Sequence, residues 1–405
     1  MFRSTAVCAA PLSSAKLNCR LVPRLHILPL KFISHEKTQM IDLNLEHMPQ
    51  PPRKKDYRIG VIGAGFIVRD VHLVAYQRAG FNVQAIACAD AAQAREVASA
   101  RRVPRAYESV EELLSDESLE VLDIAVPPGE QLGVISEVVK HASHIKGVLA
   151  QKPLSIDYGQ ALAIVEMCES AGIVLAVNQN MRYDQSIRAC KKLLDRGDLG
   201  EPVLGTIEMR AITHRKPWAR DCGRVTLMIM SIHHLDAFRY LFGEPESVYV
   251  SARTDPRADF PHCDGIPLYI LEYANGLRAA AWDDVWAGPV REGAAADNYI
   301  KWRIEGTGGL AWGTIGWPSY PNATPSTIHF TTTRVPNVWF EPTWKEVWFP
   351  DAFQGTMGQL LESLATGAQP AISGRDNLKT MALVDACYKS LAEHRVVQLA
   401  EITER

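Results

Sequence analysis

Apolar runs alternate with helical patterns in the first half of the chain. After a first run that ends at Gly63, apolar runs recur at Val83–Ala89, Val121–Val126, Gly147–Ala150 and Ile173–Val177. Continuous apolar strands separated by helices predict a parallel sheet that is covered on both faces. Ligands of such sheets bind at the carboxyl ends of the strands. The sequence places three polar or rigid segments there: Pro127-Pro128, Gln151-Lys152-Pro153 and Asn178-Gln179-Asn180.

The first strand runs into a glycine-rich turn. Gly63 and Gly65 interrupt the segment Tyr57–Val68, and a helical pattern follows over Asp70–Arg78. Such a turn brings backbone amides and the positive end of a helix to one place, which suits the pyrophosphate of a dinucleotide. The third glycine of the usual fingerprint is replaced by Val68.

The second strand ends at an acidic residue, Asp90. A carboxylate at this point can accept the hydroxyl groups of the ribose of NAD and would repel a 2′-phosphate. No basic residue directly follows Asp90, and Arg95 is five positions further on. The sequence therefore predicts NAD rather than NADP as the cofactor.

The pattern changes beyond about residue 179. A helical pattern covers Gln185–Arg196, and Asn275-Gly276 between two apolar runs is typical of a hairpin. The expected strands are Val203–Arg210, Ser247–Arg253, Leu268–Tyr273, Leu277–Asp283, Tyr299–Gly306, Leu310–Trp317, Ser326–Thr333 and Lys345–Phe349. Helices are expected at Phe353–Ala365 and Asn377–Glu393. This half is predicted to be an α+β domain with an open, mostly antiparallel sheet.

A chain of 405 residues is too long for one core of ordinary size, which predicts two domains. We expect a disordered leader and linker over residues 1–56, a doubly wound Rossmann domain over 57–178, and a substrate-binding and oligomerisation domain over 179–405. Residues 1–35 hold five Lys and Arg and no acidic residue, as a transit peptide does. Pro23, Pro29 and the lack of amphipathic periodicity favour a disordered leader, with Met40 as an alternative start.

Composition excludes several classes of partner. The chain is 47% hydrophobic and 22% charged, as soluble globular proteins are. A net charge of −3 argues against nucleic acid or an anionic membrane as a partner. Eight cysteines are scattered without a C-x-x-C pair, which predicts a reduced, cytoplasmic protein. His262-Cys263-Asp264 has no second ligand cluster, so no metal site is expected.

Two places along the sequence hold candidate acid–base groups. Lys152 follows an apolar strand at the edge where the nicotinamide should lie, and partial desolvation there would favour its neutral form. His233 and His234 lie within the apolar stretch Leu227–Phe242. Adjacent residues of a helix do not face the same way, so at most one of the two histidines should point into a cleft. Trp282 and its neighbours could stack on a sugar, but core packing is the expected role for most of them.

Taken together, these motifs resemble the Gfo/Idh/MocA family of glucose-fructose oxidoreductase and inositol dehydrogenase. The resemblance spans about Tyr57–Leu399. It rests on GAGFIV, Asp90, the loop VPPGEQ, Gln151-Lys152-Pro153 in the place of an E-K-P motif, Asn180-Met181-Arg182-Tyr183, and Ser231–Asp236 in the place of a G-x-H-x-x-D segment.

The resemblance implies a set of site residues. Lys152 and His233 would be catalytic. Contacts to NAD are implied for Gly63, Gly65, Phe66, Ile67, Asp90, Pro127, Gln131, Gln151 and Lys152. Contacts to substrate are implied for Lys152, Asn180, Arg182, Tyr183 and His233.

Three positions depart from the family pattern: Gln151 replaces a glutamate, Gln131 a histidine, and Ile229 the aspartate four residues before the histidine. The last change removes the expected partner of His233. It leaves open whether His233 or Lys152 accepts the proton.

The implied activity is NAD-dependent oxidation of a polyol or of an aldose to its lactone, with D-apiose as one candidate substrate. Two other functions remain open on this scaffold: glycoside cleavage assisted by tightly held NAD, and a catalytically inactive NAD-binding sensor. An open sheet would leave an apolar face exposed in a monomer, so we expect a homodimer or homotetramer.

Overall fold

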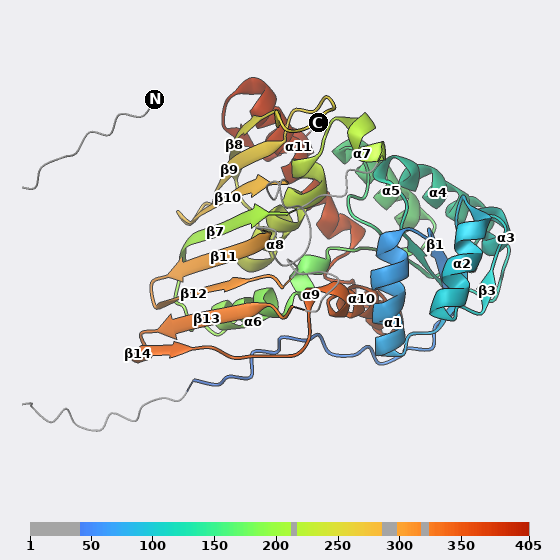
Figure 1. The fold of residues 1–405 in the computed structure, drawn as a ribbon, viewed down its shortest axis with the longest axis horizontal. Coiled ribbons are helices and arrows are strands. Elements are labelled where there is room, and N and C mark those ends of the chain that lie inside the picture. Colours follow the sequence, from blue (N-terminus) through green and yellow to red (C-terminus); the bar gives the residue numbers. More distant parts are fainter. Residues whose placement is uncertain (1–40, 212–216, 286–297, 317–323, 405) are drawn as a thin grey trace, which may run out of the picture. The chain divides into compact units, whose positions relative to one another are not determined.

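The first half of the chain forms a six-stranded parallel sheet in the order β3-β2-β1-β4-β5-β6. In the computed structural model, which describes residues 41–211, 217–285, 298–316 and 324–404, this sheet has the predicted Rossmann arrangement (Figure 1). Its strands are β1 Ile59–Ile62, β2 Val83–Ala87, β3 Arg105–Ala106, β4 Val121–Ile124, β5 Gly147–Ala150 and β6 Val174–Val177. The carboxyl ends of β1, β4, β5 and β6 meet at one edge, which confirms the prediction from the apolar runs.

Helices connect these strands, and three of them begin at a capping side chain. The connecting helices are η1 Ile67–His72, α1 Leu73–Ala79, α2 Ala91–Arg101, α3 Val110–Leu114, α4 Pro128–His141 and α5 Tyr158–Ser170. Asp90, Ser109 and Asp157 accept backbone N–H bonds at the start of α2, α3 and α5. The first turn after the glycines, η1, is π-helical.

The second half forms a nine-stranded sheet in the order β14-β13-β12-β11-β7-β10-β9-β8-β15. The strands are β7 Pro202–Arg210, β8 Ser247–Arg253, β9 Ile266–Glu272, β10 Arg278–Asp284, β11 Tyr299–Gly306, β12 Gly309–Thr314, β13 Thr327–Thr332, β14 Val335–Phe340 and β15 Val397–Gln398. The pair β7–β10 is parallel and the other pairs are antiparallel, so the sheet is mostly antiparallel as predicted. Gly276, with a φ of +85°, closes the predicted hairpin between β9 and β10.

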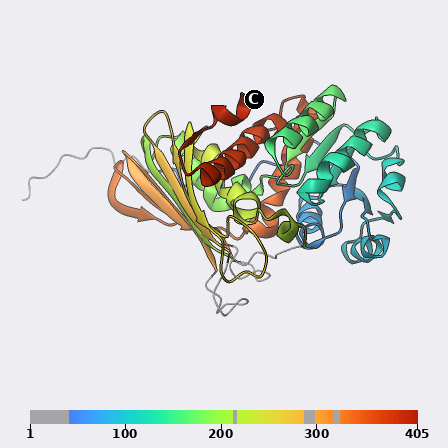
Figure 2. The same ribbon diagram turned by 90° about the horizontal axis from the view of Figure 1, so that it is seen from above.

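Helices cover one face of this sheet and leave the other face bare among the described residues (Figure 2). The covering helices are α6 Gln185–Asp195, α8 Ile232–Phe242 and α11 Gly374–Glu393. The remaining helical elements are η2 Asn180–Tyr183, α7 Pro217–Cys222, η3 Leu227–Ser231, α9 Trp348–Asp351, α10 Phe353–Thr366 and α12 Ala400–Thr403. No helix in the described ranges is long and apolar enough to span a bilayer.

Helix α10 comes late in the chain but packs on the parallel sheet. A Cβ on Gly147 of β5 would lie 3.0 Å from Leu360 and 3.1 Å from Leu364, both on α10. Just after α10, the carbonyl of Ile372 accepts a bond of 2.8 Å from the backbone N–H of Val177. The part of the chain predicted as the second domain, residues 179–405, therefore also completes the core of the first.

Two sequence predictions near the end of the sheet were wrong. Lys345–Phe349 was expected to be a strand, but α9 begins at Trp348. The strand β14 was not predicted. It contains Pro336, a residue that is rare in strands, and Asn337, which has a φ of +66° in the structure. Both are tolerated because β14 is an edge strand that needs partners on one side only.

The predicted linker is held against the fold over residues 41–56. Leu45 is buried, Glu46 pairs with Lys192 at 2.6 Å, and the backbone N–H of Arg53 donates to Glu362 at 2.7 Å. This stretch contacts α6 and α10 and is therefore not a free linker. The predicted disordered leader, residues 1–40, lies outside the described residues.

Candidate active site

The glycine-rich turn has the geometry that a dinucleotide phosphate requires. Gly63 has a φ of +115°, and a Cβ there would lie 2.5 Å from the carbonyl oxygen of Ala125, so the fold itself requires this glycine. A Cβ on Gly65 would meet nothing within 4 Å, so the space that Gly65 leaves is open to a group from outside the fold. Phe66 is the N-cap of η1 and Ile67 is its first residue, directly after this space. Their contact with the pyrophosphate stays a prediction.

Asp90 is exposed after β2, where the ribose of a dinucleotide would lie. Its Oδ1 atom accepts bonds from the backbone N–H groups of Ala92 at 3.0 Å and Gln93 at 3.2 Å. Asp90 thus caps α2 with one oxygen, and the second oxygen can serve a ligand. Arg95, the first basic residue after Asp90 in the sequence, bonds Glu108 at 2.5 Å. Its guanidinium is thus already paired and is not free to bind a 2′-phosphate.

Gln131 supports the loop that holds Lys152. Pro127 is the N-cap of α4, shortly after β4 ends, and the buried Gln131 lies one helical turn later. The Nε2 atom of Gln131 donates to the carbonyls of Gln151 at 2.6 Å and Pro153 at 2.7 Å. The amide nitrogen of Gln131 thus bonds this loop, and its expected contact with the cofactor stays a prediction.

Lys152 joins the two halves of the molecule. Its Nζ atom donates to the carbonyl of Ile229, in η3, at 2.6 Å. Burial lowers the pKa of Lys152 to about 7, because desolvation disfavours the ammonium form. An amine with this pKa can both take up and release a proton near neutral pH.

His233 is buried and lies near Lys152. Burial lowers the pKa of His233 well below its usual value, and the charges of Lys152 and His234 lower it further. Its Nδ1 atom has no hydrogen-bond partner among the described residues, and its ring meets Trp348 edge-on at 5.7 Å. His233 is therefore a neutral imidazole with an unused polar atom beside the candidate base.

His234 points instead toward the nine-stranded sheet. Its Nδ1 atom lies 2.9 Å from Oδ1 of the buried Asp283 on β10, without the alignment of a hydrogen bond. The other oxygen of Asp283 accepts from Ser231 and, at 3.3 Å, from the hydroxyl of Tyr269. Asp283 was not predicted as a site residue: its contact with His234 joins two elements that lie some fifty residues apart in the sequence.

The three predicted substrate residues that follow β6 are buried, and other residues of the fold contact each of them. Asn180 accepts from the indole of Trp348 at 3.0 Å. Arg182 forms ion pairs with Asp236 at 2.6 Å and Asp376 at 2.7 Å. Tyr183 is buried against Gly355, where a Cβ would lie 2.2 Å from its ring. Asn180 and Arg182 thus hold the surroundings of His233 in place.

Gln179 was not predicted as a site residue, but it follows β6 as Lys152 follows β5. The strands β5 and β6 pair up to Ala150 and Val177, and two residues further on are Lys152 and Gln179. Gln179 is 1% exposed, and both polar atoms of its amide lack partners among the described residues. Unpaired buried polar atoms at such an edge are typical of a ligand site. No cluster of three metal-ligating side chains occurs in the described part of the chain.

Comparisons with known proteins place this geometry in a family. Residues 57–179 match the oxidoreductase family with an NAD-binding Rossmann fold, and residues 187–311 match the C-terminal domain of the same family. The chain belongs to the Gfo/Idh/MocA oxidoreductase family. The predicted family, enzyme class and cofactor NAD are thereby confirmed.

Several family members resemble the chain over most of its length. D-apiose dehydrogenase of Paraburkholderia graminis is 26% identical over 86% of this chain and 91% of that protein. Inositol 2-dehydrogenase of Rhizobium meliloti is 26% identical over 85% of this chain and 99% of that protein. An Agrobacterium radiobacter oxidoreductase solved with NAD+, L-tartaric acid and magnesium has a TM-score of 0.71 at 23% identity, covering 85% and 99% of the two chains.

Substitution of Asp90 is expected to separate its two roles. Asp90→Asn keeps a good helix cap but loses the charge, so NAD affinity should fall by about 1–3 kcal/mol while stability is retained. Asp90→Ala should show the same loss of affinity and also lose about 0.5–2 kcal/mol of stability. Cofactor titrations with NAD and NADP, with thermal unfolding of each variant, measure both effects. Unchanged NAD affinity in Asp90→Asn would refute the ribose contact.

Substitution of the two histidines is expected to separate chemistry from stability. His233→Ala should lower turnover by roughly 10² with NAD binding retained. His234→Ala removes the neighbour of the buried Asp283 and should lower the free energy of unfolding by about 1–3 kcal/mol. Both variants would be assayed for NADH formation and thermal unfolding. A stable, inactive His234→Ala beside an active His233→Ala would show that the register of this segment is wrong.

Proposed function

We propose that the protein oxidises an aldose at its anomeric carbon, or a polyol, and uses Lys152 as the proton acceptor. The observation that carries the proposal is the amine of the half-buried Lys152, which bonds the carbonyl of Ile229 at 2.6 Å, has a pKa of about 7 and lies beside neutral His233. The relatives named for D-apiose and inositol support a sugar or polyol as the substrate, and D-apiose is the first candidate.

The proposed mechanism divides the work among the chain's own residues. When bound, NAD supplies the hydride acceptor. The neutral amine of Lys152 takes the proton of the hydroxyl that becomes a carbonyl, while the carbonyl of Ile229 orients this amine. His233, whose pKa burial lowers well below its usual value, is a weak base and serves as a hydrogen-bond partner of the substrate. The assignment of the proton to Lys152 removes the need for an aspartate at position 229.

Two other functions make different demands on the same residues. NAD-assisted glycoside cleavage would return the hydride, so it would proceed without net NADH formation. A catalytically inactive sensor would bind NAD and would not need an amine poised near pH 7. Net NADH formation from a free sugar distinguishes the proposed dehydrogenase from both.

The pH dependence of turnover tests the role of Lys152. Oxidation needs the neutral amine, so turnover should rise with pH through about 7 and then level off. Lys152→Met should retain NAD binding and lose roughly 10² or more of turnover. A panel of aldoses and polyols, with D-apiose first, would be assayed for NADH from pH 5.5 to 9. Full turnover in Lys152→Met, or no pH dependence near 7, would contradict the assignment.

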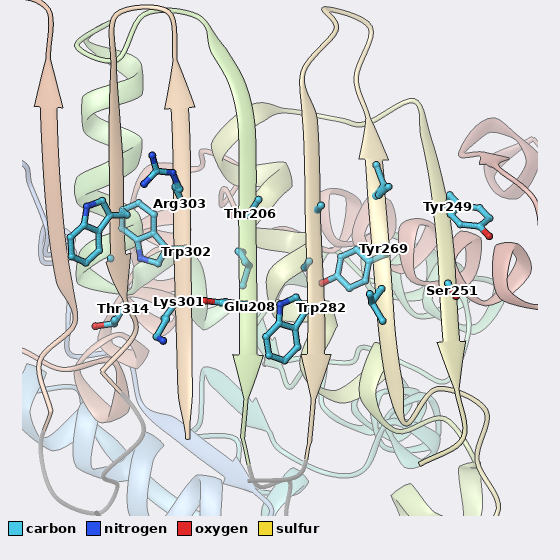
Figure 3. Close-up of a pocket in the computed structure, with 17 residues that line it drawn as sticks. Thr206, Glu208, Tyr249, Ser251, Tyr269, Trp282, Lys301, Trp302, Arg303 and Thr314 are labelled. Carbon is cyan, nitrogen blue, oxygen red and sulfur yellow. The ribbon is translucent and has the colours of Figure 1, made fainter. Parts of the chain in front are cut away.

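We also propose that the protein acts in the cytoplasm as a homodimer or homotetramer. Leu268, Ile270 and Tyr249 are 53%, 45% and 40% exposed on the bare face of the nine-stranded sheet. They line a hollow of about 730 Å³ together with Trp282 and Lys301 (Figure 3). An apolar sheet face of this kind suits a second copy of the same face. The six cysteines among the described residues form no disulfide, as expected in a reducing compartment.

A lysine on this face is expected to separate the copies. Ile270→Lys places a charge in the middle of the apolar surface, so light scattering after gel filtration should show the mass of one chain. The matched control is Val203→Lys, at a residue that is 53% exposed on β7 but does not line the hollow. Retention of the wild-type mass by Ile270→Lys, or equal dissociation of the control, would argue against this face as the interface.

A further inference from the structure

A chain of buried polar side chains lies behind Lys152. His72 of η1 is fully buried, and its Nδ1 atom lies 2.7 Å from Oδ2 of Asp123, which is itself buried in the middle of β4. The hydroxyl of Tyr76 donates to the same oxygen at 2.9 Å. A buried carboxylate requires such donors, because burial without them costs several kcal/mol.

The other nitrogen of His72 faces two side-chain amides. Its Nε2 atom lies 3.0 Å from Nδ2 of Asn178 and 3.3 Å from Nε2 of Gln151. The orientation of Gln151 follows from its second bond, in which its Oε1 atom accepts from the backbone N–H of Lys152 at 2.9 Å. Because only the amide oxygen can accept this bond, the amide nitrogen of Gln151 must face His72.

This arrangement determines the protonation of His72. Two amide N–H donors face Nε2, so Nε2 must accept and the single ring proton is on Nδ1. The N–H group at Nδ1 donates a hydrogen bond to Asp123. Asp123 thus selects one tautomer of His72, and that tautomer provides the acceptor that Gln151 needs.

We propose that Asp123 and His72 are positioning residues that hold the Lys152 loop through Gln151. The inference rests on the proposed function, in which Lys152 moves the proton. It also accounts for Gln151 in the place of the glutamate of the family motif. A carboxylate has no N–H group and would face the lone pair of His72 with repulsion.

The bond from the backbone of Lys152 to Gln151 is one of the contacts that hold the Lys152 loop. Gln131 holds the carbonyls on both sides of Lys152, and the carbonyl of Ile229 accepts from its Nζ atom. The backbone N–H of Lys152 donates to Gln151. Two titratable elements face Lys152 in the described fold: His233 of α8 interacts with its charge, and His72 with Asp123 lies behind Gln151. Loss of the Gln151 bond should therefore loosen the loop and admit water to the amine.

The test measures the titration of Lys152 directly, without a sugar. The full-length protein would be treated with limiting acetic anhydride from pH 5.5 to 10.5, and acetylation of the Lys152 peptide would be followed by mass spectrometry. In the wild type, labelling should have its midpoint near pH 7. A midpoint near that of exposed lysines, about 10.4, would show that Lys152 is solvated and would overturn the proposal.

Two replacements of His72 separate its two nitrogens. The amide nitrogen of His72→Asn can reach the place of Nδ1 and keep a donor for Asp123, but nothing then accepts from Gln151. The longer amide of His72→Gln can reach the place of Nε2. We expect the Lys152 midpoint to rise by about one pH unit or more in His72→Asn and by less than half of that in His72→Gln.

Gln151→Met removes the same link without disturbing Asp123 and remains informative if the His72 variants do not fold. It should raise the midpoint as His72→Asn does. The control is His262→Asn: His262 is half-buried and, like His72, accepts through Nε2, here from the backbone N–H of Asp255 at 2.8 Å. The control should lose stability without a shift of the Lys152 midpoint.

The outcomes separate this inference from the proposed function. An unchanged midpoint in both His72→Asn and Gln151→Met, with the proteins folded, refutes the positioning role even if a sugar is oxidised. A raised midpoint in both variants supports it even if no sugar in the panel yields NADH. Equal shifts in His72→Asn and His72→Gln would mean that Nε2 is not the atom that matters, and would also refute it.

Discussion

The buried guanidinium of Arg182 ties the two sheets together, and the site depends on that connection. Arg182 lies in η2, the short helical turn after β6, and bonds Asp236 of α8 and Asp376 of α11. Removal of one partner from such a cluster would leave a buried charge unpaired, which costs about 3–5 kcal/mol. Because Asp236 is one helical turn from His233, the same cluster fixes His233 relative to the loop of Lys152. The distance between Lys152 and His233 therefore depends on the packing of the whole core.

The sequence was sufficient to predict those parts of the site that depend on local pattern. Apolar runs located the strands of the parallel sheet, and their carboxyl ends located Gly63, Asp90 and Lys152. This succeeds because a parallel sheet converts the end of each strand into a position at one edge. The hairpin at Asn275-Gly276 was equally predictable, since its turn chemistry is contained in two residues.

The roles of single side chains could not be read in the same way. Arg182 matches a family motif that implies substrate contact, but its partners Asp236 and Asp376 come from distant helices. A sequence shows an arginine without showing which carboxylates surround it. The distinction between His233 and His234 likewise depends on Asp283, in a strand some fifty residues later. The exchange of glutamate for Gln151 had no visible reason until His72 and Asp123 were placed behind it.

The position of α10 has a consequence for the order in which the protein can fold during synthesis. The ribosome completes all six strands of the parallel sheet long before Leu360 and Leu364 emerge to pack on Gly147. Until then, part of one apolar face of that sheet lacks its cover, and an uncovered face of this kind invites aggregation or capture by a chaperone. The NAD-binding half is made first but cannot be finished first. Its last structural component arrives with the final helices of the chain.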